Sequence, residues 1–176
     1  VPPPALAKMI SPNIFPALHT TLKHFDPSPI ISVNLWFDRA IMDEPLCGLL
    51  GTTMEWVFNK PLLYGEYDRA AQGHLTLVTS AARNLVNETN DDLISLAQDD
   101  LNRVFPKAKQ AVLLHARVMR EHAATYTLPL TCQAPGTQTK HPHFFLAGDW
   151  TNTGLPGTIE SAVRSGYAAA DAVFSA

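Results

Sequence analysis

The sequence has little of what several classes of protein require. Its 176 residues include only two cysteines, Cys47 and Cys132, which are far apart and form no CxxC motif. We therefore expect free thiols, and neither a disulfide nor a metal site, which suits a reducing compartment. The net charge is only −3, so there is no electrostatic reason to expect nucleic acid as a partner.

Long hydrophobic runs and targeting signals are also absent. No apolar run approaches the roughly 20 residues of a membrane-spanning helix, and no signal peptide is visible, so we expect a cytoplasmic protein. The sequence contains no GxGxxG, the glycine loop that holds a dinucleotide pyrophosphate. At 46% hydrophobic residues, the chain can still bury one sizeable core.

The patterns that are present predict an α+β fold with an antiparallel sheet and one covering helix. Residues 1–26 predict short helical turns, because Pro12 and Pro16 interrupt the apolar spacing. Alternating or β-branched runs predict four strands, over residues 30–37, 48–58, 74–80 and 111–120. Thr89 to Asp92 has the spacing of a capping box and opens a helix that Pro106 ends. Residues 59–73, with Tyr64 and Tyr67, predict a polar connection.

The most informative stretch runs from His143 to Val173. Residues 144–147 form a continuous apolar run, typical of a strand buried on both faces, and Gly148-Asp149 ends it. A turn-rich connection then leads to a helix that Thr158 opens, with Gly157 as the expected N-cap. Its apolar residues recur at helical spacing: Ile159, Ala162, Val163, Gly166, Ala170 and Val173. Glu160 and Arg164 are spaced for an i,i+4 ion pair.

An acid after a buried strand, followed by a helix N-terminus, suits a ligand with hydroxyl groups and negative charge. The first N–H groups of a helix are unpaired and carry partial positive charge. The alternative is an ordinary strand–turn–helix corner in which Asp149 caps the turn.

The stretch LAGDWTNTGLPGTIESAVRSG, residues 146–166, resembles the C-terminal flavin-binding segment of FAD-dependent amine oxidases and phytoene-desaturase-type enzymes. Within that superfamily it resembles the squalene-associated branch, the hydroxysqualene dehydroxylases of hopanoid biosynthesis. The resemblance implies FAD as cofactor, with Asp149 at its ribityl–phosphate region and the amides of Thr158 and Ile159 at the pyrimidine end of its ring. The expected cofactor-binding residues are Gly148, Asp149, Trp150, Gly157, Thr158 and Ile159.

The resemblance also implies a division of the chain. Residues 1–26 would be a remnant of the FAD domain and a linker, residues 27–140 the substrate-binding domain, and residues 141–176 the C-terminal segment of an incomplete, Rossmann-like FAD-binding domain. Because the sequence opens VPPPALAK and lacks the glycine loop, we expect it to be the C-terminal part of a longer enzyme. The apolar faces of its last strand and helix should then be exposed or covered by another copy, which predicts self-association.

The implied activity is oxidoreduction of a squalene-type isoprenoid lipid, by reductive removal of a hydroxyl from hydroxysqualene. Such a substrate makes peripheral membrane contact conceivable. Trp56, Tyr126 and Leu155 are expected to line the substrate, although aromatic residues in strands are first of all core residues. The alternatives are a carotenoid or phytoene desaturase, a flavin amine oxidase or, for the isolated chain, a folded fragment without activity. No catalytic residue is assigned.

Three other groups of residues favour structural interpretations. His141 and His143 form an HxH pair without a third ligand at metal-binding spacing, and are expected at a surface or turn. Four acids of the predicted helix are expected on its first turns and polar face: Asp91, Asp92, Asp99 and Asp100. Glu121 and His122 could move protons near a flavin, but an ion pair at the edge of the sheet is favoured.

Overall fold

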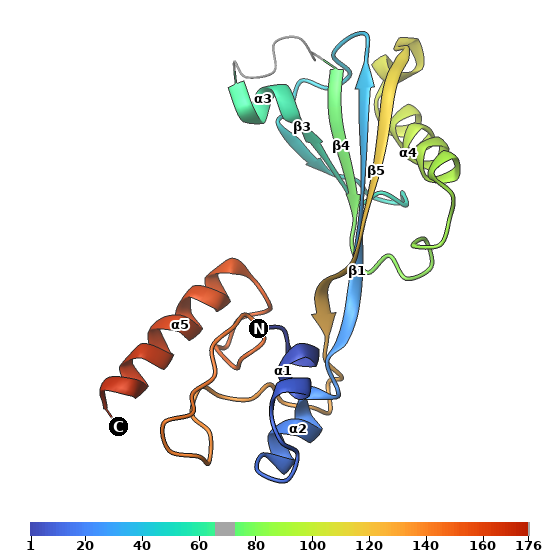
Figure 1. The fold of residues 1–176 in the computed structure, drawn as a ribbon. Coiled ribbons are helices and arrows are strands. Elements are labelled where there is room, and N and C mark those ends of the chain that lie inside the picture. Colours follow the sequence, from blue (N-terminus) through green and yellow to red (C-terminus); the bar gives the residue numbers. More distant parts are fainter. Residues whose placement is uncertain (66–72, 176) are drawn as a thin grey trace. The chain divides into compact units, whose positions relative to one another are not determined.

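The structure is a computed structural model and describes residues 1–65 and 73–175, so Tyr67 lies outside the described residues. The chain divides into two compact units. Unit 1 combines residues 1–27 with residues 125–176, and unit 2 is the continuous segment 28–124. The chain therefore leaves unit 1, builds unit 2 and returns (Figure 1). Whether these units coincide with functional domains stays a prediction.

The elements follow one another as α1 (Pro3–Met9), α2 (Pro16–Leu22), β1 (Asp26–Phe37), β2 (Leu46–Gly48), β3 (Trp56–Asn59), α3 (Lys60–Tyr64), β4 (Gly73–Thr79), α4 (Asn90–Val104), η2 (Pro106–Gln110), β5 (Leu113–Thr127) and α5 (Ile159–Phe174). Five strands form one sheet in the order β2-β3-β4-β1-β5. The β1–β4, β2–β3 and β3–β4 pairs are antiparallel. The fold is therefore α+β with an antiparallel sheet, as the sequence predicts.

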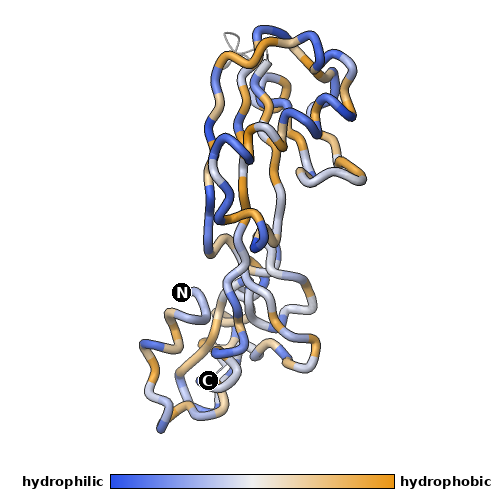
Figure 2. Tube along the Cα trace, turned by 90° about the vertical axis from the view of Figure 1, so that its right-hand side faces the viewer, coloured by the Kyte–Doolittle hydropathy of each residue, from blue (hydrophilic) through white to orange (hydrophobic). Residues whose placement is uncertain are grey.

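One face of the sheet carries the core of unit 2. The alternation in β1 buries Ile31, Val33 and Leu35, and the register places Val33 opposite Leu77 of β4. Hydrophobic and hydrophilic positions alternate along these strands (Figure 2). The apolar residues of α4 join the same core, which is why its hydrophobic spacing was readable in the sequence: Leu93, Ala97 and Leu101.

The capping box forms at α4, but one of its two hydrogen bonds differs from the usual pattern. Thr89 is the N-cap and its hydroxyl oxygen accepts a hydrogen bond from the backbone N–H of Asp92 at 3.2 Å. The Thr89 hydroxyl also donates to the Asp92 carboxylate at 2.6 Å. After Pro106 the chain continues as η2, a short 3-10 helix.

The predicted strand over residues 48–58 is wrong. The structure has β2 and β3 instead, joined by a turn in which Gly51 has a φ of 72°, a left-handed value that favours glycine. The turn is held from α4, because Asp100 accepts hydrogen bonds from the backbone N–H groups of Thr53 at 2.9 Å and Met54 at 2.8 Å. Asp100 is thus buried, and its expected place on the polar helix face is also wrong.

Three other strand predictions also differ from the structure. β1 begins at Asp26 and includes Pro27 and Pro29, which precede its pairing with β4. β5 extends to Thr127 and includes Glu121 and His122, which are both exposed and form no ion pair with each other. Residues 144–147 form no strand: among the described residues their β-pairing is an isolated bridge between Gln138 and Phe145, so no neighbouring strand supplies the hydrogen bonds that a buried strand needs.

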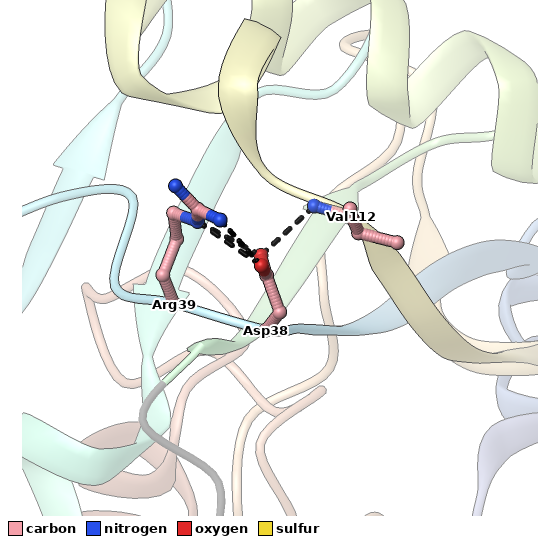
Figure 3. A network of polar contacts seen from close by, with 3 residues as sticks. All are labelled: Asp38, Arg39 and Val112. Carbon is pink, nitrogen blue, oxygen red and sulfur yellow. Dashed lines mark hydrogen bonds and ion pairs between the residues drawn. The ribbon is translucent and has the colours of Figure 1, made fainter.

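A polar network fixes the end of β1 to the start of β5 (Figure 3). The Asp38 carboxylate accepts hydrogen bonds from the Arg39 guanidinium, at 2.6 Å for the shortest, and from the backbone N–H of Val112 at 2.9 Å. The Asp38 N–H donates in turn to the Val112 carbonyl at 3.0 Å. The Arg39 hydrogen bond, followed by that of Val112, lowers the pKa of Asp38 to about 2.

The core of unit 1 draws on both ends of the chain. Its buried residues are Leu22 and Phe25 from the N-terminal segment, and Leu146 and Trp150 from the C-terminal segment. The Trp150 indole N–H also donates to the Val1 carbonyl at 3.1 Å. This unit therefore exists only when residues 1–27 and 125–176 come together.

Candidate functional site

The predicted cofactor residues lie in one loop of unit 1, between Leu146 and the start of α5. Hydroxyl groups fix its backbone. The Ser165 hydroxyl oxygen accepts from the Gly148 N–H at 2.8 Å, and the Thr151 hydroxyl donates to the Gly148 carbonyl at 2.9 Å. The Asp149 carbonyl accepts from the hydroxyls of Tyr126 at 2.9 Å and Ser161 at 3.1 Å. The loop is therefore held before any ligand binds.

The Asp149 carboxylate remains available to accept hydrogen bonds from a ligand. Asp149 is half-buried, and no described residue donates a hydrogen bond to its carboxylate. Its negative charge acts together with burial, the larger cause, to raise the pKa of Tyr126. Tyr126 is consequently a protonated hydrogen-bond donor at neutral pH, while Asp149 can accept hydrogen bonds from a ligand.

Two glycines make the loop tight. A Cβ on Gly148 would lie 2.4 Å from the Trp150 indole nitrogen, and one on Gly157 would lie 2.9 Å from the Tyr126 hydroxyl oxygen. Real side chains do not approach so closely, so both positions require glycine while their neighbours stay in place. The sequence predicted both glycines as part of the site but gave no sign of these contacts.

The N-terminus of α5 offers free donors. Its N-cap is Thr158, which corrects the expectation of Gly157, and the Thr158 hydroxyl oxygen accepts from the Ser161 N–H at 3.2 Å. Within the described part of the chain, the N–H groups of Thr158, Ile159 and Glu160 have no acceptor. The predicted ion pair from Glu160 to Arg164 forms at 2.8 Å. Three free amides therefore begin the helix that follows the Asp149 loop.

Other predicted residues lie elsewhere. Trp150 is buried in the core of unit 1, with its ring edge-on to Phe25, so its side chain packs inside and its contact with a cofactor stays a prediction. Leu155 is half-buried in the loop itself. Trp56 belongs to unit 2, where it is 45% exposed beside Gly48.

Sequence reasoning missed the hydroxyl residues that hold the loop. Ser161 and Ser165 are fully buried in α5, whereas Ile159 and Val163 are exposed. The helix thus packs on its own unit through a face of serines and alanines, and not through its larger apolar residues Ile159 and Val163. The signal was the spacing of the two serines, which places them on one side of the helix.

The remaining candidates have structural surroundings. His141 shares a hydrogen bond with the Ile14 carbonyl at 3.0 Å and its ring lies against Phe15. Cys47 and Cys132 are free thiols, as predicted. The described residues hold no group of three or more His, Cys, Asp and Glu side chains placed to bind a metal ion. Among residues 1–65 and 73–175 no helix combines the length and hydrophobicity of a membrane span.

Comparison with known proteins identifies the family. The family described as flavin containing amine oxidoreductase matches residues 1–174. The chain belongs to this family. Its relatives include a hydroxysqualene dehydroxylase of Zymomonas mobilis, 28% identical over 97% of this chain, and one of Rhodopseudomonas palustris, 33% identical over 74% of it. A 15-cis-phytoene desaturase of Glycine max is 25% identical over 82% of the chain.

The fold has a solved counterpart. A crystal structure from Exiguobacterium that carries the name protoporphyrinogen oxidase superposes with a TM-score of 0.63, at 13% identity, over 99% of this chain and 39% of its own. The chain also spans only 38% of the Zymomonas relative and 29% of the Rhodopseudomonas relative. It therefore corresponds to a part of these longer proteins.

The family's cofactor is a flavin, and part of the site fits one. The Asp149 carboxylate is without a protein partner, as a group that binds ribityl hydroxyls must be, and the free amides of Thr158 and Ile159 suit a negatively charged ring edge. The sequence contains no GxGxxG, the glycine loop that holds a dinucleotide pyrophosphate. The residues of this loop therefore fit the ribityl and pyrimidine parts of FAD.

Proposed function

We propose that this chain is part of an FAD-dependent oxidoreductase that acts on a squalene-type isoprenoid, by hydroxysqualene dehydroxylation in hopanoid or squalene biosynthesis. Two relatives of that name, each covering most of the chain, support the substrate class. The observation that carries the cofactor assignment is the half-buried Asp149 carboxylate, which has no protein donor while its own backbone carbonyl accepts two.

When bound, the flavin supplies the redox chemistry. The chain's own residues bind and orient. In this proposal, Asp149 accepts hydrogen bonds from ribityl hydroxyls, and the amides of Thr158 and Ile159 stabilise negative charge at the pyrimidine end through the positive end of the α5 dipole. Tyr126 and the two loop glycines keep the Asp149 backbone in place. Trp56, Tyr126 and Leu155 are proposed to contact the isoprenoid.

The second candidate is a phytoene-desaturase-type dehydrogenation, which the similarity to the Glycine max enzyme favours. A flavin amine oxidase is the third. For the isolated chain we propose a folded fragment without catalysis, whose FAD pyrophosphate would be held by an N-terminal partner segment that carries the glycine loop. We further propose a cytoplasmic protein with peripheral membrane contact, because its substrate would dissolve in the bilayer.

The test begins with the purified chain, FAD and an absorbance spectrum from 300 to 550 nm after gel filtration. Retained flavin bands that Asp149→Asn abolishes would support the site. Asp171→Asn is the matched control, because Asp171 is an exposed acid near the other end of α5. A colourless chain agrees with the fragment proposal, and the test then moves to the longer polypeptide.

In that polypeptide Asp149→Asn should lower flavin occupancy and Asp171→Asn should not. Equal occupancy in both variants would refute the assigned role of Asp149. Anaerobic turnover of hydroxysqualene against phytoene then separates the first two candidate reactions.

A further inference from the structure

One buried side chain of α5, that of Ser161, reaches out of its own helix to the Asp149 loop. Ser161 is the third residue of α5 and is 0% exposed. Its hydroxyl donates to the Asp149 carbonyl at 3.1 Å and shares a second hydrogen bond with the Thr153 hydroxyl at 2.6 Å. A buried hydroxyl is costly unless its hydrogen bonds are made. Both partners that satisfy this one lie outside α5.

The directions of these hydrogen bonds follow from the number of protons. Each hydroxyl has one proton, and that of Ser161 points to the Asp149 carbonyl. The Thr153 hydroxyl must therefore donate to Ser161, and the Thr153 hydroxyl oxygen accepts from the Leu155 N–H at 3.4 Å. The result is one chain of donors, from Leu155 through Thr153 and Ser161 to Asp149. Each hydroxyl in it accepts as well as donates, which strengthens the bond that it makes to the next group.

The Asp149 carbonyl is held from two sides. A carbonyl oxygen has two lone pairs, and the hydroxyls of Tyr126 and Ser161 each donate to this one. Tyr126 belongs to β5 and Ser161 to α5. No described residue donates to the Asp149 carboxylate. The direction in which the carboxylate points therefore depends on the backbone that these two hydroxyls fix.

The helix itself does not require serine at this position. The hydrogen bond that caps α5 runs from the Ser161 backbone N–H to the Thr158 hydroxyl oxygen at 3.2 Å, and any residue other than proline could make it. Alanine is smaller, has a higher helix propensity and would need no buried partner. Replacing Ser161 by alanine would therefore keep the cap and remove only the hydroxyl links to Asp149 and Thr153.

We propose that Ser161 is a positioning residue of the flavin site, which acts through the Asp149 carbonyl and is itself oriented by Thr153. The inference rests on the proposed function, in which the Asp149 carboxylate accepts hydrogen bonds from ribityl hydroxyls. These hydroxyls are neutral in the oxidised and in the reduced cofactor. Ser161 therefore controls how tightly the flavin is held, and not how easily it is reduced. The amides at the start of α5 differ in this respect, because they face negative charge that develops on reduction.

The experiment measures two quantities on the longer polypeptide: the dissociation constant of FAD, by fluorescence titration, and the reduction potential of the bound flavin. Ser161→Ala should raise the dissociation constant roughly three- to tenfold, which corresponds to the net contribution of one hydrogen bond, and should leave the potential unchanged. Ser175→Ala is the matched control, because Ser175 is exposed at the end of the same helix and its hydroxyl donates to the Asp171 carbonyl. This control should change neither quantity.

Thr153 provides a matched pair of variants that tests the chain of donors. Thr153→Val keeps the shape of the side chain and removes its hydroxyl, so it should weaken FAD binding in the same direction as Ser161→Ala. Thr153→Ser retains the hydroxyl and should recover the affinity. Added to Ser161→Ala, Thr153→Val should weaken binding no further, because the chain is already broken at Ser161.

The possible failures of this inference and of the proposed function can be told apart. An unchanged dissociation constant in Ser161→Ala, while Asp149→Asn loses flavin, would overturn the inference and leave the proposed function standing. A potential that falls in Ser161→Ala would assign this residue to the start of α5 and overturn its action through Asp149. Additive effects of Thr153→Val and Ser161→Ala would overturn the chain of donors. Full flavin affinity in Asp149→Asn would refute the proposed site and this inference with it.

Discussion

Replacing Asp100 by alanine should destabilise unit 2 far more than the same replacement of its neighbour Asp99. Both acids lie in α4, but Asp99 is exposed, whereas Asp100 is 3% exposed. One oxygen of Asp100 accepts two backbone N–H groups, from Thr53 at 2.9 Å and from Met54 at 2.8 Å. This carboxylate thus ties the helix to the turn between β2 and β3.

The magnitude follows from the different burial of the two donors. Thr53 is exposed, so water can replace Asp100 as the acceptor for its N–H, and the loss of stability is about 1 kcal/mol. Met54 is fully buried, so its N–H would be left without an acceptor, at a cost of about 2–3 kcal/mol. Alanine recovers roughly 0.5 kcal/mol through its higher helix propensity. The expected loss is about 3 kcal/mol for Asp100→Ala and within about 0.5 kcal/mol of zero for Asp99→Ala.

Urea unfolding followed by circular dichroism measures this difference. With a slope of about 2 kcal/mol per molar urea, the midpoint of Asp100→Ala should fall by about 1.5 M. Asp100→Asn keeps the shape and one acceptor oxygen, so its midpoint should lie between those of the unchanged protein and Asp100→Ala. The reasoning would be refuted if Asp100→Ala and Asp99→Ala unfolded at the same urea concentration.

Three further outcomes are expected. Gly148→Ala should destabilise unit 1 by about 1–3 kcal/mol because its Cβ meets an indole at 2.4 Å, while Gly136→Ala, with open space around it, should leave the melting temperature unchanged. Tyr126→Phe should lower the free energy of unfolding by about 1 kcal/mol, because the hydrogen bond to the Asp149 carbonyl is lost. A titration at 295 nm should then lack the raised pKa of Tyr126. The difference in stability between the two proteins should be present at neutral pH and disappear as the pH rises past 10, where the Tyr126 hydroxyl loses its proton. The pKa of Asp38 is lowered from 3.8 to about 2, so the stability that its carboxylate contributes is present above pH 4 and lost as the pH falls towards 2. The melting temperatures of Asp38→Asn and the unchanged protein should therefore converge between pH 4 and pH 2. A difference in melting temperature that stays constant over this interval would contradict the prediction.

The sequence predicted the elements whose signals are local. The alternation in β1, the Thr89 cap of α4 and the Glu160–Arg164 pair each depend on residues within a few positions of one another. All three form in the structure. The candidate residues from Gly148 to Ile159 lie together in the structure because they are nearly contiguous in the sequence, and their role in cofactor binding stays a prediction.

What the sequence could not predict depends on distant partners. The run over 48–58 has the composition of a strand, yet Asp100, far along the chain, holds a turn within it. Residues 144–147 have the pattern of a buried strand, but a strand needs neighbouring strands, and in the described part of the chain these residues make an isolated bridge to Gln138. The serine face of α5 was unreadable because its hydroxyls become satisfied only by the Asp149 loop.

The divided composition of unit 1 has a consequence for the order of folding. Its core joins Phe25 to Trp150, and the whole of unit 2 lies between them in the chain. Closing so long a loop in an unfolded chain is entropically unfavourable and slow. Unit 2 is continuous in the chain, and the long strands β1 and β5 are neighbours in the sheet and lead into the two halves of unit 1. Folding of unit 2 thereby brings the two halves of unit 1 closer together. A substitution that destabilises unit 2, such as Asp100→Ala, would therefore delay formation of the unit 1 core, although Asp100 is not part of that core.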